Sequence, residues 1–197
     1  MLRRLGNIIA YSAITLGCAA CASHTATVPS AINPALSRTW SDRSTTFLAA
    51  GSPNEGVEAA DQAIRFDAGN VTAWANKAVG LCGLRLWSEA LPAAERALAL
   101  QPNNAAALGK KALALSHLGR HDEALRAADR ALTLEPKNAE LWYDRSRSEA
   151  LKGDRAGALQ SLATAVVLDP QLKSAAATEE DLMSLSAAPD FKKLINE

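Results

Sequence analysis

The side chains best suited to chemistry are three histidines and three cysteines, and their spacing supports few reactions. His117 and His121 are four residues apart, as two metal ligands on one helix face would be, but Gly119 interrupts the helical pattern between them. His24 stands alone, and the sequence has no glycine-rich phosphate loop and no nucleophile-elbow serine. We therefore predict no enzymatic activity, no metal and no cofactor, and we interpret His117 and His121 as solvated turn residues.

Two of the cysteines, Cys18 and Cys21, have the spacing of a redox or zinc-binding pair, but no second pair or histidine cluster accompanies them. Residues Met1–Cys21 instead predict an export signal. Two arginines precede the apolar stretch Leu5–Leu16, which is too short for a confident transmembrane helix and suits a signal sequence. The third cysteine, Cys82, falls in a helical pattern and is interpreted as a small packed thiol.

The dipeptide Gly17-Cys18 at the end of the apolar stretch resembles the bacterial lipoprotein signal. This resemblance implies cleavage before Cys18, attachment of lipid to its thiol and, because no Asp follows, localisation at the outer membrane. The alternative is ordinary cleavage after Ala22, which would give a soluble exported protein. Residues 22–36 are small and polar with two prolines, and they predict a flexible linker.

The remainder of the chain repeats a unit of 34 residues, because Pro102, Pro136 and Pro170 each end an apolar run at that interval. The units span residues 37–70, 71–104, 105–138 and 139–172. Each contains two stretches with apolar residues at helical spacing, which predicts a pair of helices. Several columns agree across the units, including the large residue at the fourth position, which is Trp40, Trp74, Leu108 and Trp142.

This pattern resembles the tetratricopeptide repeat (TPR) family. The resemblance implies an all-α fold, a right-handed solenoid of four helix-turn-helix repeats, with residues 173–197 as capping helices. In that tail we expect a short helix over Gln171–Ala177, a second one capped by Thr178 with Asp181 in its first turn, and a third from Pro189. We interpret its apolar residues as core that covers the last repeat, not as a partner site: Leu172, Leu182, Leu185, Phe191 and Leu194.

The resemblance also implies a concave face, lined by the first helix of each repeat, that binds a peptide or helix. The candidate groove residues are Asn76, Lys110, His117, Tyr143 and Arg147; Arg38, Asp42, Val79, Leu113 and Asp144 are expected on the same face. Some TPR domains clamp a terminal carboxylate with Lys and Asn. Ser41 and Thr45 stand at two of those positions here, so we expect a mixed groove for a protein segment rather than a chaperone-tail clamp.

Two further columns carry opposite charge. The seventh position of each repeat is basic, and the twenty-fifth is acidic in three of them: Arg43, Lys77, Lys111 and Arg145 against Asp61, Glu95 and Asp129. We predict that these columns run near each other, with the basic stems covering apolar surface.

The repeats depart from their common pattern at four positions. Ser37 is expected to cap the first helix, whereas Asn70, Asn104 and Asn138 precede the others. Arg85 replaces the glycine expected between the two helices of repeat two, and Pro92 falls within the second of these helices. Glu149 stands at a position that is apolar elsewhere, so that surface is either less buried or provides a basic partner.

Charge and composition limit the classes of function that the sequence supports. Lys plus Arg and Asp plus Glu are both 21, so the net charge of +0 argues against nucleic acid as a partner. We expect no small-molecule substrate. The sequence predicts an exported, lipid-anchored scaffold for proteins, similar to TPR lipoproteins that assemble pili such as the Tad and type IV systems. The alternatives are a periplasmic adaptor for a protease or peptidoglycan enzyme, and a regulatory helical subunit of an enzyme.

Overall fold

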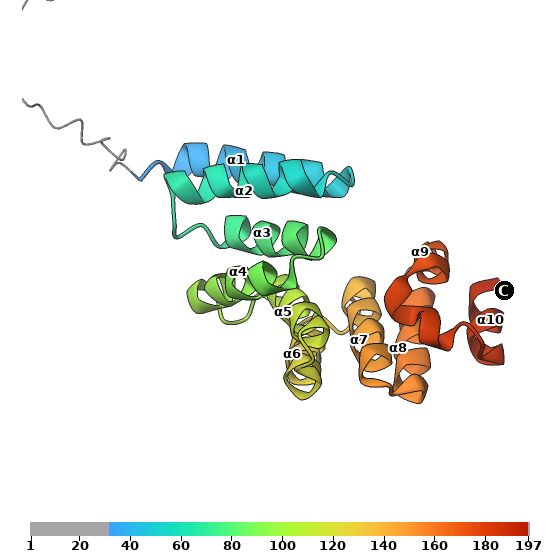
Figure 1. Cartoon of the computed structure of the whole chain (residues 1–197). Coiled ribbons are helices and arrows are strands. Elements are labelled where there is room, and N and C mark those ends of the chain that lie inside the picture. Colours follow the sequence, from blue (N-terminus) through green and yellow to red (C-terminus); the bar gives the residue numbers. More distant parts are fainter. Residues whose placement is uncertain (1–31, 197) are drawn as a thin grey trace, which may run out of the picture. The chain divides into compact units, whose positions relative to one another are not determined.

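The computed structural model describes residues 32–196, in which every regular element is a helix, as predicted. The predicted signal sequence and Cys18 lie outside the described residues. No helix in residues 32–196 combines the length and apolar character needed to cross a membrane. Eight helices form four successive pairs (Figure 1): α1 (Pro34–Ala49) with α2 (Pro53–Phe66), α3 (Val71–Gly83) with α4 (Trp87–Leu100), α5 (Ala105–His117) with α6 (His121–Leu134), and α7 (Ala139–Lys152) with α8 (Arg155–Leu168).

The stack is closer on the side of its odd-numbered helices. The helices α1, α3, α5 and α7 contact one another in succession more extensively than the even-numbered helices do. Small residues allow this approach. A Cβ at Gly109 in α5 would lie 2.7 Å from Leu141 Cδ2 in α7, and one at Gly80 in α3 would lie 3.2 Å from Leu48 Cδ2 in α1. The four odd-numbered helices therefore form one inner face, which corresponds to the predicted concave side.

Asparagine fixes where the inner helices begin. The side chains of Asn70, Asn104 and Asn138 each accept a hydrogen bond from a backbone N–H in the first turn, as predicted. In the first repeat the same contact comes from Asn33, and α1 begins at Pro34. The predicted cap at Ser37 is therefore wrong, and the first helix begins three residues before the predicted repeat. Ser37 is buried, and its hydroxyl donates to the Ala63 carbonyl at 2.8 Å.

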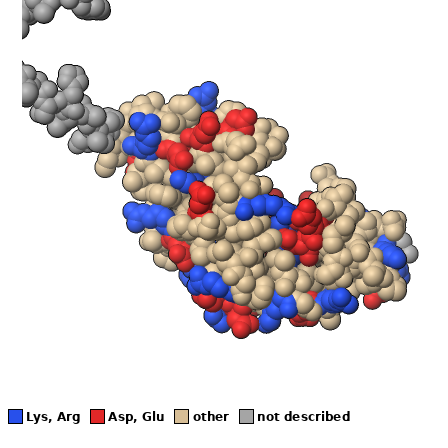
Figure 2. Space-filling model, in the orientation of Figure 1, with Lys and Arg blue, Asp and Glu red and all other residues tan. Residues whose placement is uncertain are grey.

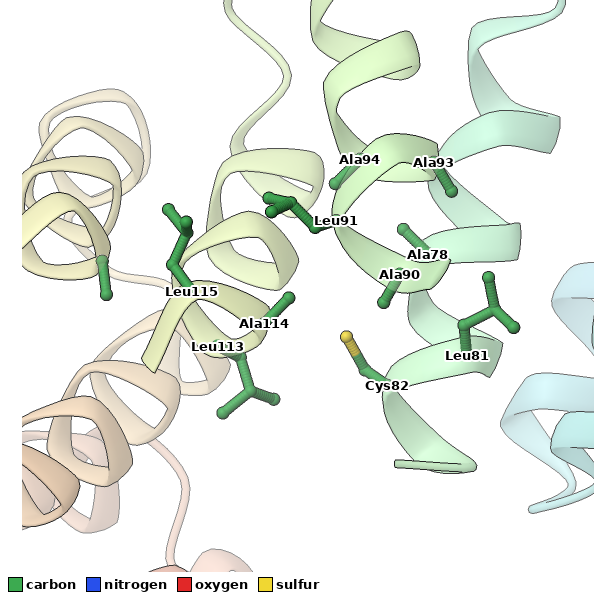
Figure 3. Close-up of a cluster of buried hydrophobic side chains, with 11 residues drawn as sticks. Ala78, Leu81, Cys82, Ala90, Leu91, Ala93, Ala94, Leu113, Ala114 and Leu115 are labelled. Atoms are coloured by element: carbon green, nitrogen blue, oxygen red, sulfur yellow. The ribbon is translucent and has the colours of Figure 1, made fainter. Parts of the chain in front are cut away.

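Alanine and leucine fill the space between repeats. Figure 3 shows the cluster at the junction of α3, α4 and α5, where Cys82 lies among apolar side chains that include Ala90 and Ala114. Burial raises the pKa of the Cys82 thiol to about 12, so this side chain stays protonated and packs as an apolar group. The half-buried Trp74 and Trp142 each donate an indole N–H to a backbone carbonyl at 2.9 Å.

The basic and acidic columns run side by side, which confirms that prediction. Nitrogen–oxygen distances are 2.6 Å for Lys77–Asp61, 2.9 Å for Lys111–Glu95 and 3.1 Å for Arg145–Asp129. The basic groups also lie over the tryptophan column, with Arg43 4.8 Å from the Trp40 ring centroid. These contacts are largely exposed, so they align neighbouring helices and contribute little stability individually.

Two of the irregular positions have local explanations. Glu149 is 3% exposed, accepts a hydrogen bond from Ser161 Oγ at 2.6 Å and lies 3.2 Å from Arg145, so a basic partner accounts for it. Burial raises the pKa of the Glu149 carboxyl. Pro92 lies beyond the first turn of α4, where its missing N–H leaves the Ser88 carbonyl without a helical donor.

The end of the chain forms three short helices: α9 (Leu172–Thr178), the 3₁₀ helix η1 (Glu180–Leu185) and α10 (Pro189–Asn196). Thr178 ends α9, so its predicted role as a cap is wrong, and Asp181 is used elsewhere. Apolar side chains of this tail cover the last repeat in one cluster, as expected: Leu182, Leu185 and Phe191 are buried, with Leu172 and Leu194 packed against them.

Candidate functional site

The inner face carries a group of charged side chains at the C-terminal half of the stack. Lys110 and His117 come from α5, and Asp144 and Arg147 come from α7. Asp144 and Arg147 are three residues apart and Lys110 and His117 are seven apart, so the members of each pair lie on one face of their helix. The tail supplies Glu179 and Asp181. We call these six residues the inner charged site: Lys110, His117, Asp144, Arg147, Glu179 and Asp181.

Lys110 and Asp144 form an ion pair between the inner helices of the third and fourth repeats. The Lys110 Nζ lies 2.8 Å from Asp144 Oδ2, and the two side chains are 18% and 5% exposed. Burial alone would lower the pKa of the Lys110 ammonium, but the Asp144 carboxylate outweighs burial and the pKa is raised. Lys110 is therefore protonated, and its ammonium is paired with the Asp144 carboxylate.

Arg147 is the centre of the site because three carboxylates surround its guanidinium. Its nitrogens lie 2.8 Å from Asp181 Oδ2, 3.4 Å from Glu179 Oε1 and 3.6 Å from Asp144 Oδ1. The side chain is 13% exposed. Burial works to lower its pKa, and these three acids together raise it. Two of its three partners belong to the C-terminal tail, so the tail is part of the site.

His117 is held between an aromatic ring and a carboxylate. Its ring is parallel to that of Trp87, with centroids 3.8 Å apart, and its Nε2 lies 3.0 Å from Asp181 Oδ2. The prediction that His117 is a solvated turn residue is therefore wrong. Burial favours the neutral form of Asp181, but His117 and Arg147 lower the pKa of this carboxyl below its usual value. No group of three His, Cys, Asp or Glu in residues 32–196 could hold a metal ion.

Tyr143 is buried beside these charges, and its hydroxyl has no hydrogen-bond partner within residues 32–196. Burial raises the pKa of the phenol, and the nearby Glu179 adds to the effect. The hydroxyl thus remains protonated at neutral pH and is a donor without an acceptor. Such a group is costly in a folded protein, and it lies in the apolar cluster that the tail completes.

The structure brings together four of the five candidate groove residues. Asn76 lies one repeat earlier, where its amide donates to the Ser41 carbonyl at 3.2 Å and to Thr45 Oγ1 at 2.9 Å. Leu113, expected on the groove surface, is 2% exposed and belongs to the core, so that assignment is wrong. The side chains around the site are thus mostly engaged within the chain.

Five residues near the site were not selected from the sequence: Arg85, Trp87, Glu179, Glu180 and Asp181. Arg85 has a backbone φ of +60°, the conformation that Gly51, Gly119 and Gly153 supply in the other repeats. Its guanidinium reaches Glu180 at 2.6 Å and Glu179 at 3.9 Å. The replacement of glycine by Arg85 was visible in the sequence and was the available signal for this contact.

Two hollows on the inner face flank Lys110 and Arg147. One has a volume of about 340 Å³ and extends from Val79 past Tyr143 to Leu172, and the other, of about 320 Å³, extends from Val79 to Arg85 and Glu179. Figure 2 shows basic and acidic side chains meeting at the hollow of the visible face. The inner face therefore has room for a chain segment beside the charged residues.

Comparisons with known proteins identify the repeats. Two profiles of the tetratricopeptide repeat family match, one over residues 110–173 and another over residues 93–126. The described helices form a tetratricopeptide-repeat solenoid. No curated protein is recognisably similar to the chain in sequence.

Solved TPR structures share the fold at low sequence identity. MamA (residues 41 to the end) from Desulfovibrio magneticus RS-1 is 19% identical with a TM-score of 0.58, and the match covers 83% of this chain and 91% of that one. The Arabidopsis OM64 TPR domain is 23% identical, with a TM-score of 0.53 and coverages of 58% and 94%. The first TPR of Spaghetti (RPAP3), solved with the HSP90 peptide SRMEEVD, is 19% identical, with a TM-score of 0.56 and coverages of 62% and 97%.

Proposed function

We propose that this protein is a non-enzymatic scaffold whose inner face binds a segment of a partner protein. The observation that carries the proposal is the convergence of Lys110, Tyr143 and Arg147 from two adjacent repeats on hollows of about 320 and 340 Å³. A TPR solenoid offers an extended, rigid surface of this kind, and such surfaces serve binding rather than catalysis. The related Spaghetti (RPAP3) domain was solved with a bound peptide, which supports the same use of the fold here.

A groove mutant must leave the ion pairs intact. Reversal of charge at Lys110 or Arg147 would place a new carboxylate beside Asp144, in a site that is almost fully buried, and would be expected to unfold the repeats. Ala106 is a better position because it is exposed, lies second in α5 and lines the larger of the two hollows. An arginine at this position would obstruct the hollow without removing a contact.

The test uses Ala106→Arg with Ala156→Arg as its matched control. Ala156 is also exposed and second in its helix, but it lies on the outer helix α8. Both full-chain variants serve as bait in envelope fractions, and the captured proteins are compared with those of the wild type by quantitative mass spectrometry. We expect Ala106→Arg to lose a specific partner that Ala156→Arg retains. Equal capture by both variants would contradict binding at the inner face.

We further propose that the protein works in a bacterial envelope, anchored by lipid on Cys18. The support is the sequence alone: two arginines, an apolar stretch and Gly17-Cys18 at its end. Metabolic labelling with a fatty-acid analogue tests this proposal. Cys18→Ser should abolish labelling and Cys21→Ser should preserve it. Labelling that survives Cys18→Ser would instead favour cleavage after Ala22 and a soluble exported form.

Within the envelope, we propose assembly of a pilus or secretion machine as the role of the scaffold, by analogy of architecture. A periplasmic adaptor for a protease or peptidoglycan enzyme is the alternative. The partner captured by the wild type and lost with Ala106→Arg separates the two, because the first role predicts a structural subunit of a membrane ring and the second a hydrolase.

A further inference from the structure

The C-terminal tail lies on the proposed binding surface in the manner of a ligand. Its three acidic residues contact side chains from three successive inner helices: Arg85 after α3, His117 in α5 and Arg147 in α7. A peptide laid across the inner face of the solenoid would follow the same line. Two of these contacts, at His117 and Arg147, are with residues that the sequence marked as groove residues.

The tail supplies the acids that offset the positive charge of the inner face. Without the tail, the two hollows of the inner face would present Arg85, Lys110 and Arg147 against two acids, Glu140 and Asp144. The tail adds the carboxylates of Glu179, Glu180 and Asp181. A surface with this surplus of positive charge favours an acidic segment, and the docked tail removes the surplus.

The acidic part of the tail is separate from the part that covers the core. Leu182 and Leu185 are at most 1% exposed and pack against α8 and its neighbours, whereas Glu180 has a side chain that is 73% exposed. The two leucines belong, with Ala176 and Phe191, to the apolar cluster that covers the last repeat. The three carboxylates add nothing to that apolar cover, so their contacts need another explanation.

The docked tail also shows signs of imperfect fit. It leaves the Tyr143 hydroxyl buried without a partner, and η1 is a six-residue 3₁₀ helix with no side-chain cap at its start. Arg85 holds a left-handed backbone conformation at the position where the other repeats use glycine. A segment held in this way can be exchanged for a better ligand.

We infer that the inner face recognises an acidic protein segment with carboxylates two residues apart, and that Glu179–Asp181 occupies this site until such a partner displaces it. The inference rests on the proposed function, since it names the chemistry of the partner and the regulation of the same surface. A tail held in place lowers the apparent affinity for the partner by the fraction of molecules in which the site is free.

The test measures binding of a fluorescent peptide that copies residues 177–186, ATEEDLMSLS, to the full chain. In the variant Glu179→Gln, Glu180→Gln and Asp181→Asn, the tail can no longer compete through charge. We expect the peptide to bind this variant roughly tenfold or more tightly than it binds the wild type. A peptide with Gln and Asn at its three acidic positions should bind neither protein, and salt should weaken the specific binding.

Equal affinity of the acidic peptide for the folded triple variant and the wild type would overturn the inference. Where the triple variant fails to fold, Glu180→Gln replaces it, because this exposed side chain contacts only Arg85 and should still raise the affinity a few-fold. The outcome is distinct from that of the scaffold test. Loss of the partner with Ala106→Arg, together with no gain for either tail variant, would retain the scaffold and reject the acidic ligand.

Discussion

The first two repeats and the last two join their inner helices by different chemistry. Between α1 and α3 the contacts are neutral, with the Asn70 amide donating to Ser37 Oγ and Ser41 Oγ at 2.8 Å and Asn76 donating to Thr45. Between α5 and α7 the corresponding contacts are ionic and centre on Asp144. The same helix packing tolerates both kinds of contact, and in the ionic half the groups that join the helices are charges that an external ligand could replace.

The largest effect should come from removing the acid at the centre of the ionic half. Asp144→Ala takes away the carboxylate that pairs with Lys110 and leaves Arg147 with the carboxylates of the tail, in a site where the side chains are at most 19% exposed. A buried charge without its partner costs about 3–5 kcal/mol. Urea unfolding should show this loss, and a loss below about 1 kcal/mol would mean that water reaches the pair.

The matched change in the neutral half should cost less. Asn70→Ala removes a helix cap and two hydrogen bonds to serine, but it leaves no charge behind. Urea unfolding under the same conditions should show a loss of about 1–2 kcal/mol in the free energy of unfolding. An equal loss of unfolding free energy in Asn70→Ala and Asp144→Ala would contradict the difference between the neutral and the ionic half.

Stability should also depend on pH through the ionic half. The pKa of Asp181 is lower in the folded chain than in the unfolded chain, so its ionised form stabilises folding. That contribution is present above the unfolded pKa of about 3.9 and is lost as the pH falls through the folded value. The free-energy difference between wild type and Asp181→Asn should therefore be about 1–3 kcal/mol at pH 7 and should shrink below pH 4. A difference that is constant between pH 7 and pH 3 would contradict this assignment.

A smaller effect, of opposite sign, is expected at Arg85. Arg85→Gly relieves the left-handed backbone, for a gain of about 0.5–1 kcal/mol, and loses only half-exposed ion pairs. The reciprocal change Gly119→Arg imposes the same conformation on arginine, at a position where a Cβ would meet nothing within 4 Å, and should destabilise by a similar amount. If Arg85→Gly instead destabilises the chain, the contact with the tail is worth more than the strain.

The smallest effect is predicted for the paired basic and acidic columns, which lie on the side of α5 opposite the inner charged site. Lys111→Met removes an ion pair with Glu95 whose side chains are 28% and 48% exposed, and the methionine keeps most of the apolar stem. The free energy of unfolding should change by less than about 1 kcal/mol. A larger change would make this column comparable with the inner charged site.

The fold could be predicted because the sequence repeats the same pattern at a fixed interval. The asparagine caps and the paired charged columns recur every 34 residues, and Trp74 and Trp142 occupy the same position two repeats apart. The pattern of one repeat therefore predicts the structure of the next. Where the period is broken, prediction failed. Ser37 was assigned as a cap by its position in the repeat, although Asn33 provides the cap in the structure.

The site was predictable only in part, for a related reason. Lys110, Tyr143 and Arg147 were found from repeat positions, but the acids of the tail follow no period, and Arg85 and Glu180 are 95 residues apart. His117 was assigned to solvent because nothing local in the sequence indicates Trp87 and Asp181 as its neighbours. Contacts of this kind depend on how the tail folds back, which helical periodicity does not specify.

The central claim is that the three carboxylates hold the tail on the inner face. Hydrogen exchange of the full chain tests it most directly, with wild type compared with the variant Glu179→Gln, Glu180→Gln and Asp181→Asn. The account predicts faster exchange in α9 and η1 of the variant and unchanged exchange in α1 to α4. Equal protection of η1 in both proteins would show that Leu182 and Leu185 hold the tail without help from the acids, and would contradict the account.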